Sequence, residues 1–240
     1  ENNQFRLLFQ PVISLRGDSD EHYGVLLRML NPQGEEVSPN DFISAAKAEG
    51  LTEKIDRWVV LNSIKLLSEH RSKGHNTKLF VHISGASLQD QSLLPWLSVA
   101  LKAARLPSDA LIIQFSEPDA IEYLKQAKTL TQGLAELHCK VSLSQFGCAA
   151  NPFNTLKHLT VDFVKIDGSY TQDLSKPENL ESLKVLLASL HSQAKLTIVP
   201  YVETASTMST LWQAGVNYIQ GYFLQGPSQG MDYEFSSGNE

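Results

Sequence analysis

Cysteine is scarce in this sequence. Cys139 and Cys148 are the only two cysteines in 240 residues. They are too few for a disulfide framework, and their spacing is not that of a metal-binding motif. Such scarcity is typical of proteins in a reducing compartment, so we expect a cytoplasmic protein.

Long apolar runs and clusters of basic residues are also lacking. No stretch is long and apolar enough to span a bilayer, and the N-terminus is not signal-like, so we expect no membrane insertion. The net charge is -6, from 20 Lys and Arg against 26 Asp and Glu, which argues against binding to a nucleic acid polymer. Any phosphate-bearing ligand must therefore be held by a few local cations.

Length and composition predict one large domain. With 42% hydrophobic and 19% charged residues over 240 positions, the chain can bury one sizeable core, and a single α/β barrel of this length is common. We expect residues 1–240 to form a single domain. Because the sequence opens on Glu1 without a Met, we also expect it to be part of a longer multidomain protein.

Apolar, strand-like segments alternate with amphipathic stretches. The expected strands are 6–13, 23–30, 78–84, 110–115, 140–146, 162–166, 196–199 and 217–220, and the expected helices are 39–50, 52–71, 93–104, 119–137, 178–193 and 207–214. Strands that alternate with helices form parallel sheets, and eight of them close into a TIM-like (β/α)8 barrel, an α/β fold. Only the polar segment 14–21 separates the first two strands, so we expect an antiparallel first strand.

The segment Tyr23–Arg28 is an apolar run that holds one glycine, Gly24, and closes on a cation, Arg28. Both residues are unfavourable in a buried barrel strand, which indicates a place where a ligand approaches the backbone. The alternative is an edge strand with a bulge and a surface arginine.

The carboxyl ends of barrel strands meet at one rim, where this fold places its active sites. A two-metal hydrolase needs carboxylates at that rim to hold its ions. Amides are poor ligands for hard cations, and a lone histidine is more often structural. The expected strand ends carry mostly uncharged groups: Arg28, His82, Gln114, Ser144, Gln145, Lys165, Asp167 and Gln220. These residues disfavour metal-assisted hydrolysis.

A series of short motifs gives the chain a family resemblance. They are Gln10-Pro11-Val12, Gly24-Val25-Leu26-Leu27-Arg28, Ile55-Asp56, Ile83-Ser84, Ser116-Glu117, Phe146-Gly147, Lys165-Ile166-Asp167, Val202-Glu203-Thr204 and Gln220-Gly221-Tyr222. In this order they resemble the EAL domain, a bacterial family that binds cyclic di-GMP and, in active members, linearises it. The resemblance covers nearly the whole chain and implies the EAL version of the barrel.

The positions that bind metal in active EAL domains are changed. Five of the six replacements remove a carboxylate: the matching residues are Gly24, His82, Gln114, Ser144, Gln145 and Pro200. The resemblance therefore implies loss of the metal site, together with loss of negative charge facing a dianionic ligand. We expect no metal or other cofactor, no catalytic residue and no phosphodiesterase activity.

The positions that hold the nucleotide are mostly kept. The resemblance implies cyclic di-GMP contacts from Gln10, Leu26, Arg28, Asp56, Glu203 and Pro227. The guanidinium of Arg28 suits phosphate oxygens, Asp56 and Glu203 match acceptors for guanine, and Pro227 matches an apolar surface against a base. The alternatives are that Asp56 faces solvent and that Glu203 caps the following helix.

Together these features predict a catalytically inactive cyclic di-GMP receptor. The segments LLFQPVISLRGD and YFLQGP are most similar to a degenerate subgroup of the family that acts in type IV pilus and twitching-motility control. Some members of that subgroup bind a PilZ-domain protein, so we expect such a partner. Two alternatives stay open: a scaffold that no longer binds nucleotide, because of Gly24 and Pro200, and a weak phosphodiesterase that recruits metal through His82.

Overall fold

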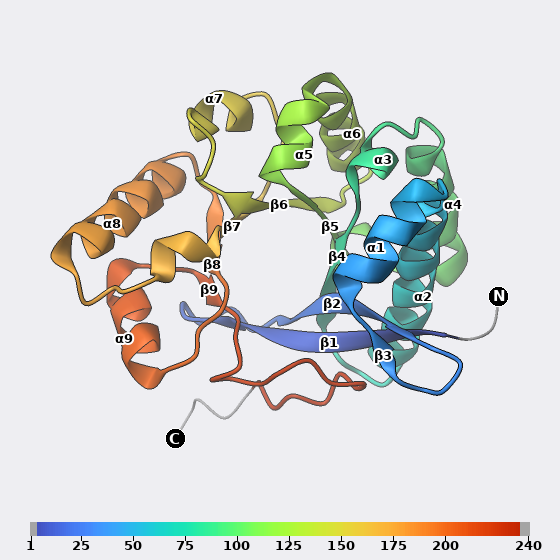
Figure 1. Cartoon of the computed structure of the whole chain (residues 1–240), viewed down its shortest axis with the longest axis horizontal. Helices are drawn as coiled ribbons and strands as arrows, with labels where there is room; N and C mark the ends of the chain where they lie inside the picture. Colours follow the sequence, from blue (N-terminus) through green and yellow to red (C-terminus); the bar gives the residue numbers. More distant parts are fainter. Residues whose placement is uncertain (1–3, 236–240) are drawn as a thin grey trace.

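Eight strands pair in a closed ring within residues 4–235, the part of the chain that the computed structural model describes (Figure 1). The ring runs from β1 through β2, β4, β5, β6, β7, β8 and β9 and returns to β1. Its members are β1 (Phe5–Ser14), β2 (Glu21–Leu30), β4 (Thr77–His82), β5 (Leu111–Ser116), β6 (Lys140–Phe146), β7 (Phe163–Ile166), β8 (Leu196–Val199) and β9 (Tyr218–Ile219). The predicted TIM-like barrel is confirmed.

The first strand runs against its neighbours. β1 pairs with β2 in antiparallel register from Phe5 opposite Met29 to Val12 opposite His22, and it is also antiparallel to β9. The other neighbours in the ring are parallel. A short β3 (Glu36–Val37), which was not expected, extends the sheet from β2 outside the ring. The predicted antiparallel first strand is confirmed.

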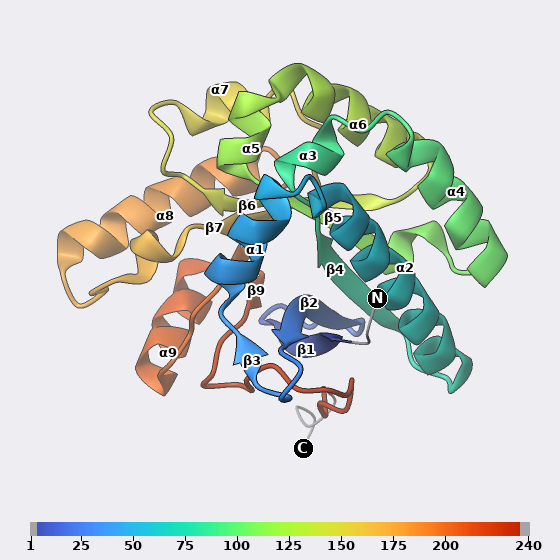
Figure 2. The same cartoon turned by 45° about the vertical axis from the view of Figure 1, so that its right-hand side comes forward.

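Helices cover the outside of the ring (Figure 2). They are α1 (Pro39–Ala48), α2 (Thr52–Ser72), α3 (Gly85–Leu88), α4 (Leu93–Ala104), α5 (Glu117–Glu122), α6 (Leu124–Glu136), α7 (Pro152–Leu156), α8 (Pro177–Ser192) and α9 (Ala205–Ala214). The prediction of one helix over 119–137 is wrong, because Tyr123 adopts φ -120° and ψ 46° and separates α5 from α6. Such a backbone conformation interrupts the helical hydrogen-bond ladder.

Aromatic and branched side chains fill the interior of the barrel. Val12, Phe80, Ile112, Phe163, Ile198 and Tyr218 form one buried cluster inside the ring. Phe80 and Phe163 meet edge to face, with centroids 5.1 Å apart. Val12, Phe80 and Ile198 of this cluster also line a cavity at the carboxyl ends of the parallel strands, so the cluster forms the floor of that cavity.

The C-terminal segment takes the place of a helix over β1. It passes along the strand in Figure 1, and it is attached by two backbone hydrogen bonds, Phe9 N to Ser228 O at 2.7 Å and Ser228 N to Phe9 O at 2.9 Å. This pairing places Pro227 beside the mouth of the barrel. Within residues 4–235, no helix has both the length and the apolar character required to cross a bilayer.

Candidate functional site

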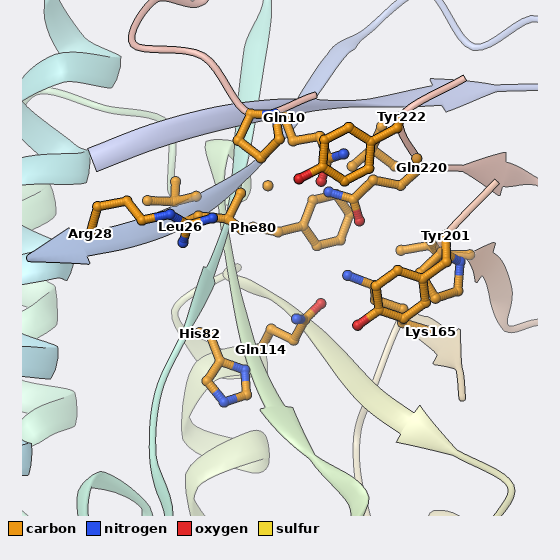
Figure 3. A pocket seen from close by; sticks show the side chains of 17 residues that line it. Gln10, Leu26, Arg28, Phe80, His82, Gln114, Lys165, Tyr201, Gln220 and Tyr222 are labelled. Carbon is orange, nitrogen blue, oxygen red and sulfur yellow. The ribbon is translucent and has the colours of Figure 1, made fainter. Parts of the chain in front are cut away.

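A cavity of about 290 Å³ opens at the carboxyl ends of the parallel strands. Figure 3 shows Arg28 on one side of this space and Tyr201 and Lys165 on the other. The lining is Gln10, Val12, Gly24, Val25, Leu26, Arg28, Phe80, His82, Gln114, Lys165, Ile198, Pro200, Tyr201, Gln220, Gly221, Tyr222 and Pro227. The cavity therefore lies at the rim where the sequence predicts the candidate site.

Two cations line this cavity and no carboxylate does. Arg28 Nη1 donates to the carbonyl of Leu27 at 3.1 Å. Lys165 is partly buried in the cavity wall on β7, and desolvation lowers the pKa of its ammonium group to about 8. In the described part of the chain neither cation forms an ion pair with an acidic side chain. The cavity consequently has a positive potential suited to an anion.

The donor set of the cavity does not fit a pair of metal ions. His82 is the one lining residue of a type that commonly binds metal; its side chain is exposed toward the cavity, and loss of hydration there lowers the pKa of its imidazole. It lies opposite Gln114 in the sheet, where Gln114 accepts a hydrogen bond from Ser142 at 3.0 Å. Two-metal hydrolysis requires bridging carboxylates to hold both ions. Among residues 4–235, the groups with three clustered ligands lie at the opposite end of the barrel.

Two of the six positions to which the resemblance assigns metal ligands, Ser144 and Gln145, do not line the cavity. The pairing of β6 with β7 shifts between Leu143 and Phe146, and Gln145 adopts φ 53°. Ser144 donates to the carbonyl of Phe115 at 3.3 Å, while Gln145 is exposed. This irregularity turns both side chains out of the lining.

Gly24 lies in a regular part of the barrel rather than at an edge. It pairs with Gln10 on one side and with Phe80 on the other, so the alternative of a bulged edge strand is wrong. A Cβ at this position would lie 2.8 Å from Nε2 of Gln220. The amide of Gln220 therefore occupies the space above the glycine, and a larger residue there must displace it.

Four of the six predicted ligand contacts line the cavity. They are Gln10, Leu26, Arg28 and Pro227. Gln10 is 8% exposed and donates from Nε2 to the carbonyl of Gln225 at 3.2 Å, which ties β1 to the C-terminal segment. The structure thus brings together residues that are 217 positions apart in the sequence, from Gln10 to Pro227. Their contact with a nucleotide stays a prediction.

Asp56 is not among the lining residues. Its Oδ2 accepts three hydrogen bonds, from Ser84 N at 2.9 Å, Ser84 Oγ at 2.6 Å and Ser87 Oγ at 2.6 Å. The carboxylate therefore fastens α2 to the first turn of α3. Since these bonds all use one oxygen, a role in ligand binding would have to use Oδ1.

Glu203 also lies outside the lining, on the exposed loop that follows β8. It does not cap α9, because that position belongs to Thr204, whose hydroxyl accepts from Thr207 N at 3.1 Å. The neighbouring Val202 is fully buried, with its backbone against Gly221. Glu203 is exposed two residues after the lining residue Tyr201, and its guanine contact stays a prediction.

Two tyrosines at the mouth were missed by sequence reasoning. Tyr201 and Tyr222 line the cavity, and each is 70% exposed. Tyr201 adopts φ 60°, a left-handed conformation that is rare for a bulky side chain and frequent at functional sites. Each follows the carboxyl end of a strand, and Tyr222 also stands in the motif Gln220-Gly221-Tyr222, but neither was assigned a ligand contact.

The fold and the cavity together define a (β/α)8 protein with a cationic pocket for a small anionic ligand. The sequence matches the EAL domain family over residues 1–227, so the chain belongs to this family. It is 70% identical to the FimX EAL domain from Pseudomonas aeruginosa, solved bound to c-di-GMP, with a TM-score of 0.94 over 98% of this chain and 95% of that chain. It is 32% identical to the FimX EAL domain of Xanthomonas citri in complex with c-di-GMP, with a TM-score of 0.91 over 98% of this chain and 92% of that one. The predicted resemblance to the EAL family and to this subgroup of it is confirmed.

Curated relatives carry the same kind of domain within longer proteins. The chain is 28% identical over 97% of its length to the cyclic di-GMP phosphodiesterase PdeF of Escherichia coli, of which it covers 31%. It is 27% identical over 98% of its length to the phosphodiesterase PdeR of the same organism, of which it covers 35%. The chain therefore spans about a third of the length of these relatives.

Proposed function

We propose that this chain is a catalytically inactive receptor domain that binds intact cyclic di-GMP without metal. The observation that supports this most strongly is the pair of cations, Arg28 and Lys165, in a cavity without carboxylates. A dianionic ligand supplies the charge that this cavity lacks, and no cation is needed to screen repulsion between ligand and pocket. The two FimX EAL domains solved with c-di-GMP are similar over nearly their whole length.

The lining offers a partner for each part of a cyclic dinucleotide. Arg28 presents a guanidinium fork to phosphate oxygens, and Lys165 presents a second positive charge. Tyr201, Tyr222 and Pro227 offer flat apolar surfaces on which bases stack. Glu203, two residues after the lining residue Tyr201, can accept from the donors of a guanine edge. These roles follow from residue chemistry and position.

The proposed absence of hydrolysis rests on the same lining. Activation of water by two metal ions requires ligands that hold the ions about 3.5 to 4 Å apart, and His82 is the one suitable donor in the lining. The other positions hold Gly24, Gln114 and Pro200. A single neutral imidazole cannot replace that set. We propose that phosphodiesterase activity is absent here, although relatives such as PdeF are named phosphodiesterases.

A product assay tests the proposed inactivity. The chain is incubated with cyclic di-GMP and Mg²⁺ or Mn²⁺, with an active EAL phosphodiesterase as positive control, and the linear dinucleotide is separated by chromatography. We expect none above the rate without protein, and none with Gly24→Glu. Metal-dependent product that Lys165→Ala abolishes would contradict the proposal.

The output of such a receptor has to be another protein. Because it does no chemistry, ligand binding acts only by changing its affinity for a partner, and that coupling is reciprocal. On the resemblance to FimX we propose a PilZ-domain protein as the partner and type IV pilus and twitching-motility control as the process. Titration of a purified PilZ-domain protein with and without nucleotide is the test. Absence of binding in both conditions would remove this partner and leave the receptor proposal intact.

A further inference from the structure

Two histidines and a glutamate meet at the amino end of the barrel, opposite the nucleotide cavity. Glu21 begins β2, His70 lies in the last turn of α2, and His75 lies in the turn between α2 and β4. Their ligand atoms all lie within 4.8 Å of one another. On β2, Glu21 lies seven positions before Arg28 and three before Gly24, the first lining residue of that strand, which at ~3.3 Å per residue places Glu21 about 23 Å from Arg28 and about 10 Å from Gly24.

The separations between these atoms are those of ligands around one small ion. His75 Nδ1 is 3.3 Å and His70 Nε2 is 3.8 Å from Oε2 of Glu21. Ligands about 2.0 to 2.2 Å from a tetrahedral zinc ion lie roughly 3.3 to 3.6 Å from one another. The distance from His75 Nδ1 to Glu21 therefore lies within this range, and that from His70 Nε2 exceeds it by about 0.2 Å.

The cluster also contains a buried polar atom that makes no hydrogen bond within residues 4–235 and whose contact with Oε2 of Glu21 is 3.8 Å long. Nε2 of His70 is buried and makes no hydrogen bond in the described part of the chain. Buried polar nitrogens are nearly always satisfied, so this atom calls for an explanation such as a bound ion. The rings of His70 and His75 stack with centroids 4.0 Å apart and planes at 11°, and they must splay for both nitrogens to face one ion. His75 is 43% exposed and has room for that rotation.

The surrounding residues orient the cluster. Oγ1 of Thr77, a fully buried residue, donates to Oε2 of Glu21 at 2.8 Å, and Nη1 of Arg71 donates to the carbonyl of Thr77 at 2.7 Å. Hydrogen bonds of this kind fix the direction of a metal-binding carboxylate. A hollow lined by Glu21, His75 and residues 231–235, including Asp232 and Glu234, lies beside the cluster and leaves space for a fourth ligand.

From this arrangement we propose that Glu21, His70 and His75 form a zinc site that joins β2, the end of α2 and the start of β4. Two imidazoles and one carboxylate suit Zn²⁺ and related transition metals, whereas Mg²⁺ prefers oxygen ligands. The site is separate from the nucleotide cavity and does not depend on the proposed receptor function. Because the folded chain binds the ion and the unfolded chain has no preformed site, the ion stabilises the fold.

Calorimetry with an untagged chain tests this site. The protein is treated with EDTA, exchanged into metal-free buffer and titrated with ZnCl2, and the visible absorption of Co²⁺ reports its coordination. We expect one equivalent of Zn²⁺ to bind, a four-coordinate Co²⁺ spectrum, no competition by Mg²⁺ and a rise in melting temperature with Zn²⁺. Absence of Zn²⁺ binding by the unaltered chain would overturn the proposal.

Variants at exposed positions locate the ion. We expect His75→Gln to weaken Zn²⁺ binding at least tenfold and to remove the thermal shift. His158→Gln, which alters an exposed histidine outside the cluster, serves as the matched control and should bind as the unaltered chain does. Equal binding by both variants would show that the ion lies elsewhere and would overturn the assignment. Cyclic di-GMP titration of His75→Gln, expected to be unchanged, keeps this outcome separate from that of the receptor proposal.

Discussion

The two ends of the barrel differ in whether their cationic side chains are paired with carboxylates. At the amino end, Lys78 Nζ lies 2.8 Å from Oδ2 of Asp20 and 3.7 Å from Oδ2 of Asp109, and Lys140 lies 3.8 Å from Asp162. At the carboxyl end, Arg28 and Lys165 line the cavity without an acidic partner in the described part of the chain. Within residues 4–235, the two lysines at the amino end are paired with carboxylates, whereas the two cations at the carboxyl end are not.

This difference separates structural charge from functional charge. A partly buried ammonium group is costly unless it is paired, and the cost is visible as the lowered pKa of Lys165, about 8. The paired cations at the amino end are satisfied within the chain and need no ligand. The unpaired cations at the carboxyl end gain a partner only when an anion binds, so their cost indicates a binding site.

Of the substitutions considered, Arg28→Ala should weaken nucleotide binding at the carboxyl end most strongly. Loss of a charged hydrogen bond to phosphate should weaken cyclic di-GMP binding by about 1.5 to 3 kcal/mol, and this is measured by calorimetry in EDTA. Lys184→Ala, which removes an exposed cation of α8 outside the cavity, is the control and should change nothing. Equal affinities of the two variants would place the pocket elsewhere.

Glu203→Ala should weaken binding by a comparable amount, about 1.5 kcal/mol, because a guanine edge would lose a charged acceptor. Asp56→Asn is the informative comparison, since the Asp56 carboxylate is occupied by Ser84 and Ser87. We expect Asp56→Asn to reduce thermal stability as well, whereas Glu203→Ala should leave stability unchanged. If Glu203→Ala binds normally, the guanine contact is misassigned.

Nucleotide affinity should fall as the pH rises above about 8, because Lys165 then loses its proton in the free protein. The bound anion raises the pKa of this group, so binding above pH 8 takes up a proton. We expect the dissociation constant to rise up to about tenfold between pH 7 and pH 9. Lys165→Met should bind more weakly at pH 7 and lose this part of the pH dependence. A wild-type affinity that is flat across this range would contradict the role of Lys165.

Tyr201→Gly should have opposite effects on binding and on stability. Loss of a stacking surface should weaken binding by about 1 kcal/mol or more. Relief of the left-handed conformation at φ 60° should raise the free energy of unfolding by up to about 1 kcal/mol. Calorimetry and urea denaturation measure the two effects. A variant that is destabilised and binds normally would remove Tyr201 from the site.

Lys78→Met should lower stability at the amino end of the barrel without changing nucleotide affinity. It leaves Asp20 and Asp109 without their shared cation, so we expect a loss of about 1 kcal/mol of stability and unchanged nucleotide affinity. Urea denaturation measures the loss. A weakened affinity would mean that the two ends are coupled.

Sequence patterns predicted the barrel because each strand is a short apolar run and each long helix has an apolar face. The patterns missed what rests on a few residues or on distant pairing. β3 and α3 are too short to show a period, and the break at Tyr123 depends on one pair of backbone angles. The pairing of Phe9 with Ser228 joins residues at opposite ends of the chain, which no local pattern encodes.

The candidate site was predictable where it depends on strand ends and not where it depends on loops. Arg28 and Lys165 follow from their places on β2 and β7, whose carboxyl ends meet at the rim. Asp56 matches the family motif, but its oxygen is engaged by serines that only the folded chain brings near. Tyr201 and Tyr222 occupy loop positions whose direction depends on backbone angles that the sequence does not specify.

Calorimetric titration of cyclic di-GMP into the chain in EDTA tests the central claim most directly. A cationic cavity that needs no metal should bind one dinucleotide per chain with a dissociation constant of about 1 μM or tighter, roughly -8 kcal/mol. Binding that appears only after Mg²⁺ or Mn²⁺ is added would contradict the account and support a metal-dependent phosphodiesterase. Absence of binding under either condition would contradict it as well and support a scaffold that no longer recognises the nucleotide.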